Sequence, residues 1–453
     1  MAELVVTGGT VVTASGVVRA DVAVDGGRIS AVGPDLARDG AEVMDATGML
    51  VLPGVIDVHT HVRVPSVDEP DRYFRDSLAA GRGGTTTFLT FNNPGTGISP
   101  QAQRSLLRGL HEFKEATAGQ SAVDFGLSAV ITGQQDDPIA ELPPLIDAGV
   151  PTFKAFMVYD FRLADDELLR AMQVAARHGG MLQVHCEDPS VIDPLVAHAL
   201  AAGDVGCRHH ALCRPAAAEA AATRRAIGLA RRAEASLYVV HLSCEGALEA
   251  VAEAKARGEP VYAETCPHYL TFTSELYDDP DESEVIKRVI SPPLRSQTDV
   301  DALWQGLREG TLDTIGSDHV PDRLAVEKHV PAPPFPQISN GGPGIETLLS
   351  VVYSEGVARG RLSPERMVEL LSTSPARLFG LPSKGTIEVG RDADLVLFDP
   401  ATRRTIRQAE LHHTSDYTPY EGMDVSGAVH AVLLRGAPVG PPAGRFLERR
   451  IGR

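Results

Sequence analysis

The stretch VIDVHTH at residues 55–61 is an apolar run that ends in two histidines, His59 and His61. Further runs of the same kind carry a residue that can hold a metal or move a proton: TFKAF (152–156) with Lys154, LQVHCE (182–187) with His185, LYVVHLS (237–243) with His241 and DTIGSDH (313–319) with Asp318. In a (β/α)8 barrel the carboxyl ends of the strands open on one face, where distant residues converge. The pattern therefore predicts a barrel with a metal-dependent hydrolytic site.

Strand-like and helix-like segments alternate along the middle of the chain. The runs TTTFLTFN (85–92), DFGLSAVI (124–131) and PVYAETCPHYL (260–270) bring the expected strands to eight. Between the strands, helical patterns are expected at residues 74–84, 100–119, 136–148, 165–179, 190–203, 216–234 and 246–258. This alternation is typical of a parallel sheet with right-handed crossovers, which closes into a barrel.

The two ends of the chain have a different texture. LVVTGGTVV (4–12) and DVAVDGGRISAVG (21–33) show β-hairpin signals, and GTIEVGRDADLVLFDP (385–400) and AVHAVLLRGAPV (428–439) repeat them. Because short β segments bury little alone, we expect them to pair into one small β-sandwich. The predicted division is residues 1–53 as the first part of the sandwich, 54–384 as the catalytic barrel, and 385–453 as its second part with a C-terminal tail.

Composition narrows the class of protein. The 453 residues are 43% hydrophobic and 23% charged, which is ordinary for a globular protein, and the net charge of -18 disfavours nucleic acid and anionic lipid as partners. No stretch is long and apolar enough for a membrane helix, and the start lacks a secretory pattern, so we expect a cytoplasmic protein. The five cysteines form no CxxC pair, and reduced, buried packing residues are the favoured interpretation over soft-metal ligands.

Each candidate residue also has a structural interpretation. One HxH pair is weak evidence for a metal, His185 and His241 are compatible with hydrogen-bonded core histidines, and Asp318 with a helix N-cap. Lys154 is harder to explain structurally, because an unpaired lysine is unfavourable in an apolar strand unless it points outward. The structural interpretation must hold separately at every strand end, whereas one binuclear site accounts for them all.

Eight motifs across nearly the whole chain are, as a set, highly specific: HTH (59–61), FKAFMVY (153–159), VHCE (184–187), HLSC (241–244), ETCPHYL (264–270), SPPLR (291–295), GSDH (316–319) and NGGPG (340–344). The chain resembles the cyclic amidohydrolases, and within them the dihydropyrimidinases and hydantoinases. The segments SEGVARGRLS and YTPYEGMDVSG extend the resemblance into the C-terminal third.

The resemblance implies two Zn²⁺ ions per subunit, bridged by a hydroxide and by Lys154 carboxylated on its side-chain nitrogen. His59, His61 and Asp318 would hold one metal, and His185 and His241 the other. The chemistry is consistent, because a deprotonated lysine amine can add CO2 and then offers two oxygens and a negative charge to two cations.

The resemblance also implies roles in the opening of a cyclic amide, imide or ureide ring. Tyr159 would stabilise the oxyanion, and Asp318 would take a proton from the hydroxide and return it to the leaving nitrogen. Ser291 and Asn340 would bind the ring largely through main-chain groups, although both are also ordinary turn residues. A homotetramer or homodimer is implied as well.

Arg63 departs from the hydantoinase pattern, because HTHVR places an arginine on the same side of the strand as the histidines. Dihydroorotases have an arginine there that holds the substrate carboxylate, and Asn92 and Asn93 also resemble that enzyme. Pairing of Arg63 with Asp68, Glu69 or Asp71 is the structural alternative. The segment FKAFMVYD with Tyr159 and the C-terminal third resemble the hydantoinases more closely. Dihydropyrimidinase or hydantoinase activity is therefore the first expectation, and allantoinase or dihydroorotase activity is the second.

A non-catalytic scaffold is a third possibility, because relatives of dihydropyrimidinase exist that keep the fold and lose the metal site. A complete ligand set disfavours it. Ring size, ring substituent and the D or L stereospecificity depend on loop shapes that sequence patterns do not define.

Overall fold

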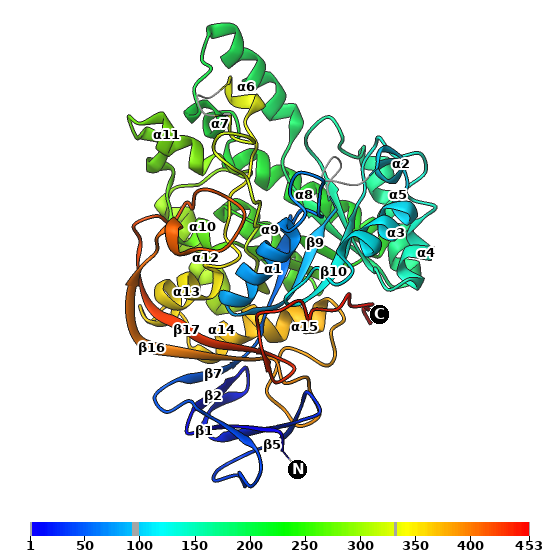
Figure 1. Ribbon diagram of the computed structural model, residues 1–453. Helices are drawn as coiled ribbons and strands as arrows, with labels where there is room; N and C mark the ends of the chain where they lie inside the picture. Colours follow the sequence, from blue (N-terminus) through cyan, green and yellow to red (C-terminus); the bar gives the residue numbers. More distant parts are fainter. Residues whose placement is uncertain (1, 93–98, 330–332, 453) are drawn as a thin grey trace.

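The computed structural model describes residues 2–92, 99–329 and 333–452. At its centre lies a sheet of eight parallel strands in the order β15-β14-β13-β12-β11-β10-β9-β8 (Figure 1). The strands are β8 (Val55–Thr60), β9 (Thr85–Phe91), β10 (Asp124–Val130), β11 (Thr152–Phe156), β12 (Met181–His185), β13 (Leu237–Val239), β14 (Val261–Thr265) and β15 (Thr314–Ile315). The barrel closes between the two ends of this order, where Thr60 of β8 pairs with His319, just after β15. Next to this bridge, the His61 amide donates to the His319 carbonyl at 2.7 Å. The predicted barrel is confirmed.

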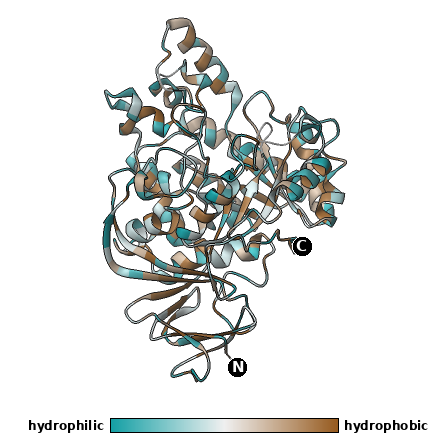
Figure 2. Ribbon diagram, in the orientation of Figure 1, coloured by the Kyte–Doolittle hydropathy of each residue, from teal (hydrophilic) through white to brown (hydrophobic). Residues whose placement is uncertain are grey.

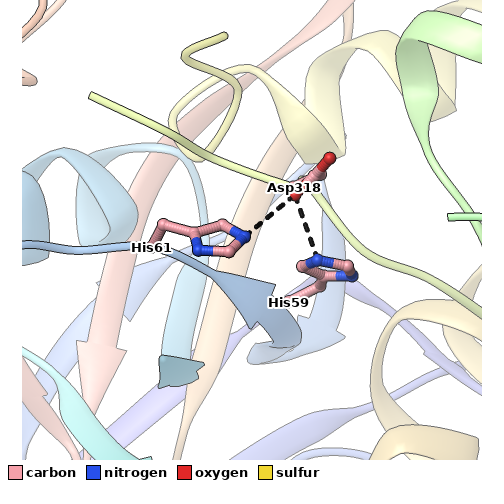
Figure 3. A group of neighbouring side chains, drawn as sticks. All are labelled: His59, His61 and Asp318. Carbon is pink, nitrogen blue, oxygen red and sulfur yellow. Dashed lines mark ion pairs between the residues drawn. The ribbon is translucent and has the colours of Figure 1, made fainter. Parts of the chain in front are cut away.

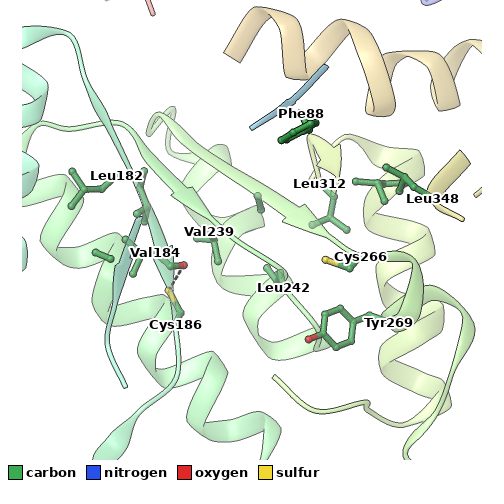
Figure 4. Close-up of a cluster of buried hydrophobic side chains, with 14 of the residues drawn as sticks. Phe88, Leu182, Val184, Cys186, Val239, Leu242, Cys266, Tyr269, Leu312 and Leu348 are labelled. Atoms are coloured by element: carbon green, nitrogen blue, oxygen red, sulfur yellow. Dashed lines mark hydrogen bonds between the residues drawn. The ribbon is translucent and has the colours of Figure 1, made fainter. Parts of the chain in front are cut away.

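The barrel strands are apolar along their length because they are covered on both faces. Every residue of β9, β10, β11 and β12 is buried, as is usual for parallel strands beneath helices. Leu182 and Val184 of β12 and Val239 of β13 belong to the main core cluster, where Cys186 and Cys266 also lie (Figure 4). All five cysteines are free and buried, which agrees with their prediction as packing residues.

The helices outside the barrel are amphipathic, with hydrophobic and hydrophilic residues along the same segment (Figure 2). In α5, for example, Leu168, Ala171, Met172 and Ala175 are buried at helical spacing. The longer helices are α1 (Arg72–Arg82), α3 (Leu106–Thr117), α5 (Asp165–His178), α6 (Pro189–Ala202), α8 (Ala216–Ala233), α9 (Glu245–Ala256) and α12 (Gln297–Glu309). The described residues contain no helix with the length and apolar character to cross a membrane.

Shorter helical segments complete the layer around the barrel and its loops. They are α2 (Pro100–Arg104), α4 (Leu142–Asp147), α7 (Arg208–Leu212), α10 (Pro267–Thr271), α11 (Glu282–Val285), α13 (Leu348–Val352), α14 (Pro364–Val368) and α15 (Ser374–Leu378), with the 3-10 or π segments η1 (Ser274–Asp278), η2 (Ile286–Arg288), η3 (Phe335–Gln337), η4 (Tyr353–Val357), η5 (Glu369–Thr373) and η6 (Gln408–Glu410).

Two predicted helices differ from the observed ones. The expected helix at 100–119 is broken at Ser105, whose backbone is extended and whose hydroxyl accepts from the amide of Arg108 to cap α3. The expected helix at 136–148 begins only at Leu142. Prolines lie in the first turn of α4, where the missing N–H costs no hydrogen bond because the first amides of a helix have no partner within it.

The chain termini build two further sheets at one end of the molecule (Figure 1). One has the order β5-β4-β1-β6 and the other β18-β17-β16-β7-β2-β3, with β1 (Leu4–Thr7), β2 (Thr10–Thr13), β3 (Gly16–Arg19), β4 (Asp21–Asp25), β5 (Arg28–Gly33), β6 (Glu42–Asp45), β7 (Leu50–Pro53), β16 (Leu395–Thr405), β17 (Asp424–Leu434) and β18 (Ala437–Pro438). β16 pairs antiparallel with β7, so the C-terminal segment completes a sheet that the N-terminal segment begins.

The C-terminal tail leaves these sheets and returns to the barrel. Phe446 forms a β-bridge with Phe125 of β10, and the buried Arg449 donates to the carbonyl of Phe379 at 3.2 Å and to the hydroxyl of Thr152 at 2.9 Å. The tail therefore packs beside the start of β11, a contact that the sequence pattern did not indicate.

Candidate functional site

His59, His61 and Asp318 meet at the carboxyl ends of the barrel strands (Figure 3). Asp318 Oδ1 lies 3.0 Å from His59 Nε2 and 3.3 Å from His61 Nε2. One ligand atom from each residue lies within 4.8 Å of the others, and His59 and Asp318 are buried. Two imidazole nitrogens and a carboxylate oxygen at this spacing form a donor set that suits zinc and similar cations.

The backbone at the site is strained where it presents side chains. Asp318, His241 and Tyr159 have positive φ angles of 49°, 38° and 76°. Left-handed backbone is unfavourable for residues with a side chain, and such strain persists only where neighbouring contacts hold it. At His241 the amide donates to Glu264 Oε1 at 3.2 Å, which fixes the end of its strand.

Glu264 is buried beside His59 and fixes the orientation of its ring. Its Oε1 atom is 2.5 Å from His59 Nδ1, and its Oε2 atom accepts from the hydroxyl of Tyr238 at 2.9 Å. A carboxylate on Nδ1 keeps the proton there and leaves Nε2 available as a ligand. Burial alone would lower the pKa of His59, but the carboxylates of Glu264 and Asp318 outweigh this effect and raise the pKa.

Lys154 projects from β11 into the same space, with its Nζ atom 3.5 Å from His59 Nε2. Its side chain is buried between the rings of Phe91 and Phe156, and no carboxylate within 4 Å pairs with it in the described part of the chain. Burial lowers its pKa to about 8, against the opposing effect of Asp318. A buried amine with this pKa loses its proton far more readily than an exposed lysine.

His185 and His241 occupy the neighbouring strand ends. Their ring centroids are 4.5 Å apart, and the His241 ring lies 5.2 Å from that of His59. Burial lowers the pKa of both imidazoles, so both are neutral at pH 7 and able to donate a lone pair. The buried Nδ1 atom of His241 has no hydrogen-bond partner among the described residues, whereas Nε2 of His185 is 2.6 Å from Glu187.

One cavity of about 280 Å³ gathers these side chains with the expected substrate-binding residues. Its lining comprises His61, Lys154, Phe156, Tyr159, Phe161, His185, His241, Ser291, Asp318, Val320, Ser339 and Asn340. Its volume approaches the lower range of small-ligand pockets. The structure thus brings together the residues that the sequence singled out, apart from Arg63.

Tyr159 lies beside one of the metal-ligating candidates, with its ring centre 5.6 Å from that of His185. Burial raises the pKa of its phenol, and the Arg214 charge together with hydrogen bonds to Ser291 and Asn340 offsets this only in part, so the hydroxyl is protonated and can donate at pH 7. The Arg214 guanidinium lies 5.2 Å from the centre of the Tyr159 ring, which favours its orientation. Ser291 Oγ is also 3.2 Å from His210 Nε2.

Arg63 is held away from this cavity. Its guanidinium donates to Asp322 Oδ1 at 2.7 Å and to Glu327 Oε1 at 2.8 Å, both in the segment after β15. Glu69 pairs instead with Arg72 and Arg323. These two carboxylates give Arg63 a structural role, as its alternative interpretation expected. Its partners, however, are not the acidic residues at 68, 69 and 71 that were predicted from the sequence.

Asn92 is also used structurally, because its Oδ1 atom accepts from the Val130 amide at 2.9 Å. Asn93 lies outside the described residues.

Two carboxylates of the site were not assigned a role from sequence. Glu264 binds His59, and Glu187 lies between His185 and Arg214, whose Nη1 atom is 2.5 Å away. The available signal was position, because a charged residue inside or just after a buried strand is unfavourable without a partner. Ion pairing with Arg214 outweighs the effect of burial and lowers the pKa of Glu187 to about 2.

Comparison with known proteins places the chain among enzymes of one family. The model of the amidohydrolase family matches residues 50–439. The D-hydantoinase of Ralstonia pickettii is 40% identical over 99% of both chains, and that of Geobacillus stearothermophilus is 41% identical over 94% of this chain and 91% of its own. The crystal structure of dihydropyrimidinase from Brevibacillus agri superposes with a TM-score of 0.93 at 40% identity, covering 99% of each chain. The chain belongs to the amidohydrolase family.

Proposed function

We propose that this protein is a metal-dependent hydrolase that opens cyclic amides, as in the dihydropyrimidinase and D-hydantoinase reactions. Dihydrouracil or a 5-substituted hydantoin would give an N-carbamoyl amino acid. The observation that supports this proposal most strongly is the single cavity that holds Lys154, His61, His185, His241 and Asp318 together. The similarity of this protein to relatives named D-hydantoinase and dihydropyrimidinase supports the same reaction class.

The residues fit two divalent metals, for which zinc is the proposed identity. His59, His61 and Asp318 would hold the first metal, because their donor atoms already lie within 4.8 Å of one another. His185 and His241 would hold the second, and the Nδ1 atom of His241, which has no hydrogen-bond partner in the described part of the chain, is available for it. Lys154 as a carbamate would bridge the pair and replace a buried ammonium, which has no carboxylate within 4 Å among the described residues, by an anion with two oxygens.

The bound metals would polarise the substrate carbonyl and lower the pKa of a water molecule toward neutrality. The chain supplies the proton chemistry. The imidazoles of His59 and His61 outweigh the effect of burial and hold the pKa of Asp318 well below its usual range, so its carboxylate is ionised and can accept a proton from water. Asp318 then returns the proton to the ring nitrogen as the amide bond breaks.

Tyr159 would stabilise the charge that develops on the carbonyl oxygen. Its phenol is protonated and lines the cavity with Ser291 and Asn340. A donor fixed before the reaction stabilises the transition state without reorganisation. Ser291 and Asn340 lie on two different segments at this wall, where their main-chain groups would bind the ring.

The position of Arg63 does not support binding of an acidic substrate. Its guanidinium lies outside the cavity and is already hydrogen-bonded to the carboxylates of Asp322 and Glu327. The complete set of metal-ligating candidates disfavours a scaffold. We further propose the domain division 1–53, 54–384 and 385–453, a homotetramer or homodimer, and a cytoplasmic location, which rest on sequence pattern and family resemblance.

The test is a panel of dihydrouracil, hydantoin, allantoin and dihydroorotate, assayed on zinc-grown protein together with metal analysis. We expect two metals per chain and turnover of the neutral rings above that of dihydroorotate. Preference for dihydroorotate, or bound metal with no turnover of any ring, would refute the proposal.

A further inference from the structure

Lys328 is a fully buried lysine that lies outside the metal site. Its Nζ atom donates to the carbonyl of Val289 at 2.9 Å and to the carbonyl of Ser339 at 2.7 Å. Its side chain has 0% exposure, and the carboxylate that pairs with it is Asp322, at 3.9 Å. Burial of an ammonium is unfavourable unless its donors are satisfied, so these contacts hold the surrounding backbone tightly.

The two carbonyls belong to the segments that form one wall of the cavity. Val289 precedes Ser291 by two residues, and Ser339 is followed directly by Asn340. Ser291, Ser339 and Asn340 all line the cavity, whereas Lys328 does not. A single ammonium therefore joins the backbones of both predicted ring-binding segments from behind.

Asp322 connects this ammonium to the metal side of the cavity. Its Oδ1 atom accepts from Arg63 at 2.7 Å, and Arg63 follows His61 by two residues. Asp322 is itself four residues beyond Asp318 and has 0% side-chain exposure. The contacts from Arg63 to Asp322 and from Asp322 to Lys328 thus connect the loop after His61 with the segment that ends in Asn340.

We propose that Lys328 is a positioning residue for substrate binding, which sets the spacing between the main chains at Ser291 and Asn340, and that Asp322 anchors it. This inference rests on the proposed function. Because the ammonium touches neither the cavity nor a metal-ligating side chain, its loss should weaken binding of the ring while leaving the metals and the chemical step in place.

The test is Lys328→Met in the full-length, zinc-loaded protein, with hydantoin and dihydrouracil as substrates. We expect KM to rise about tenfold while kcat stays within about twofold, because the lost contact acts on ground state and transition state alike. The metal content should remain that of the unchanged protein. Lys328→Arg, which keeps the charge and several donors, should restore part of the lost affinity.

Lys255→Met is the matched control. Lys255 likewise donates to a backbone carbonyl, that of Gly310 at 3.1 Å, and pairs with a carboxylate, Asp313 at 2.7 Å. Its side chain is partly exposed and lies outside the cavity lining. Its KM should stay unchanged. If Lys328→Met does not fold, Asp322→Asn takes its place, and a severalfold higher KM at unchanged metal content is expected.

An unchanged KM in the folded variants would overturn the inference, as would equal losses of kcat and metal. Absence of turnover in the unchanged protein would instead refute the proposed function, so the two failures are distinguishable.

Discussion

Replacement of Glu264 by Gln should weaken metal binding although Glu264 is not itself a predicted ligand. Glu264 accepts from His59 Nδ1, from the His241 amide and from the Tyr238 hydroxyl. Glutamine has the same shape but only one accepting atom at its end. If its NH2 group faces His59, the imidazole must place its proton on Nε2, which then cannot bind a metal.

The expected loss is about 10-fold to 100-fold in metal affinity, the usual range when a carboxylate behind a ligating histidine is removed. This corresponds to about 1.4–2.7 kcal/mol. A competition titration with a chromogenic zinc chelator measures the change directly. Tyr238→Phe is the control, because it removes the hydroxyl contacts with Glu264 Oε2 and Thr314 but leaves the contact of Oε1 with His59. The metal affinity of this variant should change less than about threefold.

Unchanged metal affinity in Glu264→Gln would refute the assigned role. An equal loss in Tyr238→Phe would show that general disruption of the barrel interior, and not the tautomer of His59, determines the effect.

Three other substitutions test the roles of site residues. Lys154→Ala should bind fewer than two metals and show no turnover, with partial rescue by small carboxylic acids; near-normal rates would contradict the bridging role. Tyr159→Phe should lower kcat about 10²–10³-fold, as loss of an oxyanion donor does, whereas Tyr262→Phe, away from this cavity, should leave kcat unchanged. Arg63→Met should lower the free energy of unfolding by about 1–3 kcal/mol through its buried partner Asp322. The ratio of dihydroorotate to dihydrouracil turnover should stay constant, and selective loss of dihydroorotate turnover would place Arg63 at the substrate.

The barrel was predictable because its signals are local and repeat. Each strand is a short apolar run, and parallel strands bring their carboxyl ends to one face whatever their separation in sequence. His59 and Asp318 could therefore be placed together although 259 residues separate them in the printed sequence. The pairing of the terminal β segments followed from the same reasoning, because neither could bury an apolar face alone.

The partners of charged residues could not be predicted in this way. Arg63 and Asp322 are 259 residues apart, and Glu264 and His59 are 205 apart, so no local pattern connects them. Proximity in sequence favours the acidic residues 68, 69 and 71 as partners of Arg63, but the loop after β15 brings Asp322 and Glu327 closer in space. The prediction of one helix at 100–119 was wrong for a local reason. Hydrophobic periodicity indicates a single helix there, but the hydroxyl of Ser105 caps a new helix and divides the segment in two.

Anomalous X-ray diffraction at the zinc edge, from crystals of zinc-grown protein, tests the central claim most directly. The account predicts two anomalous peaks per chain inside the cavity, one beside His59, His61 and Asp318 and the other beside His185 and His241, with extra density joined to Lys154. A cavity without peaks in metal-loaded protein, or peaks only elsewhere on the chain, would contradict it.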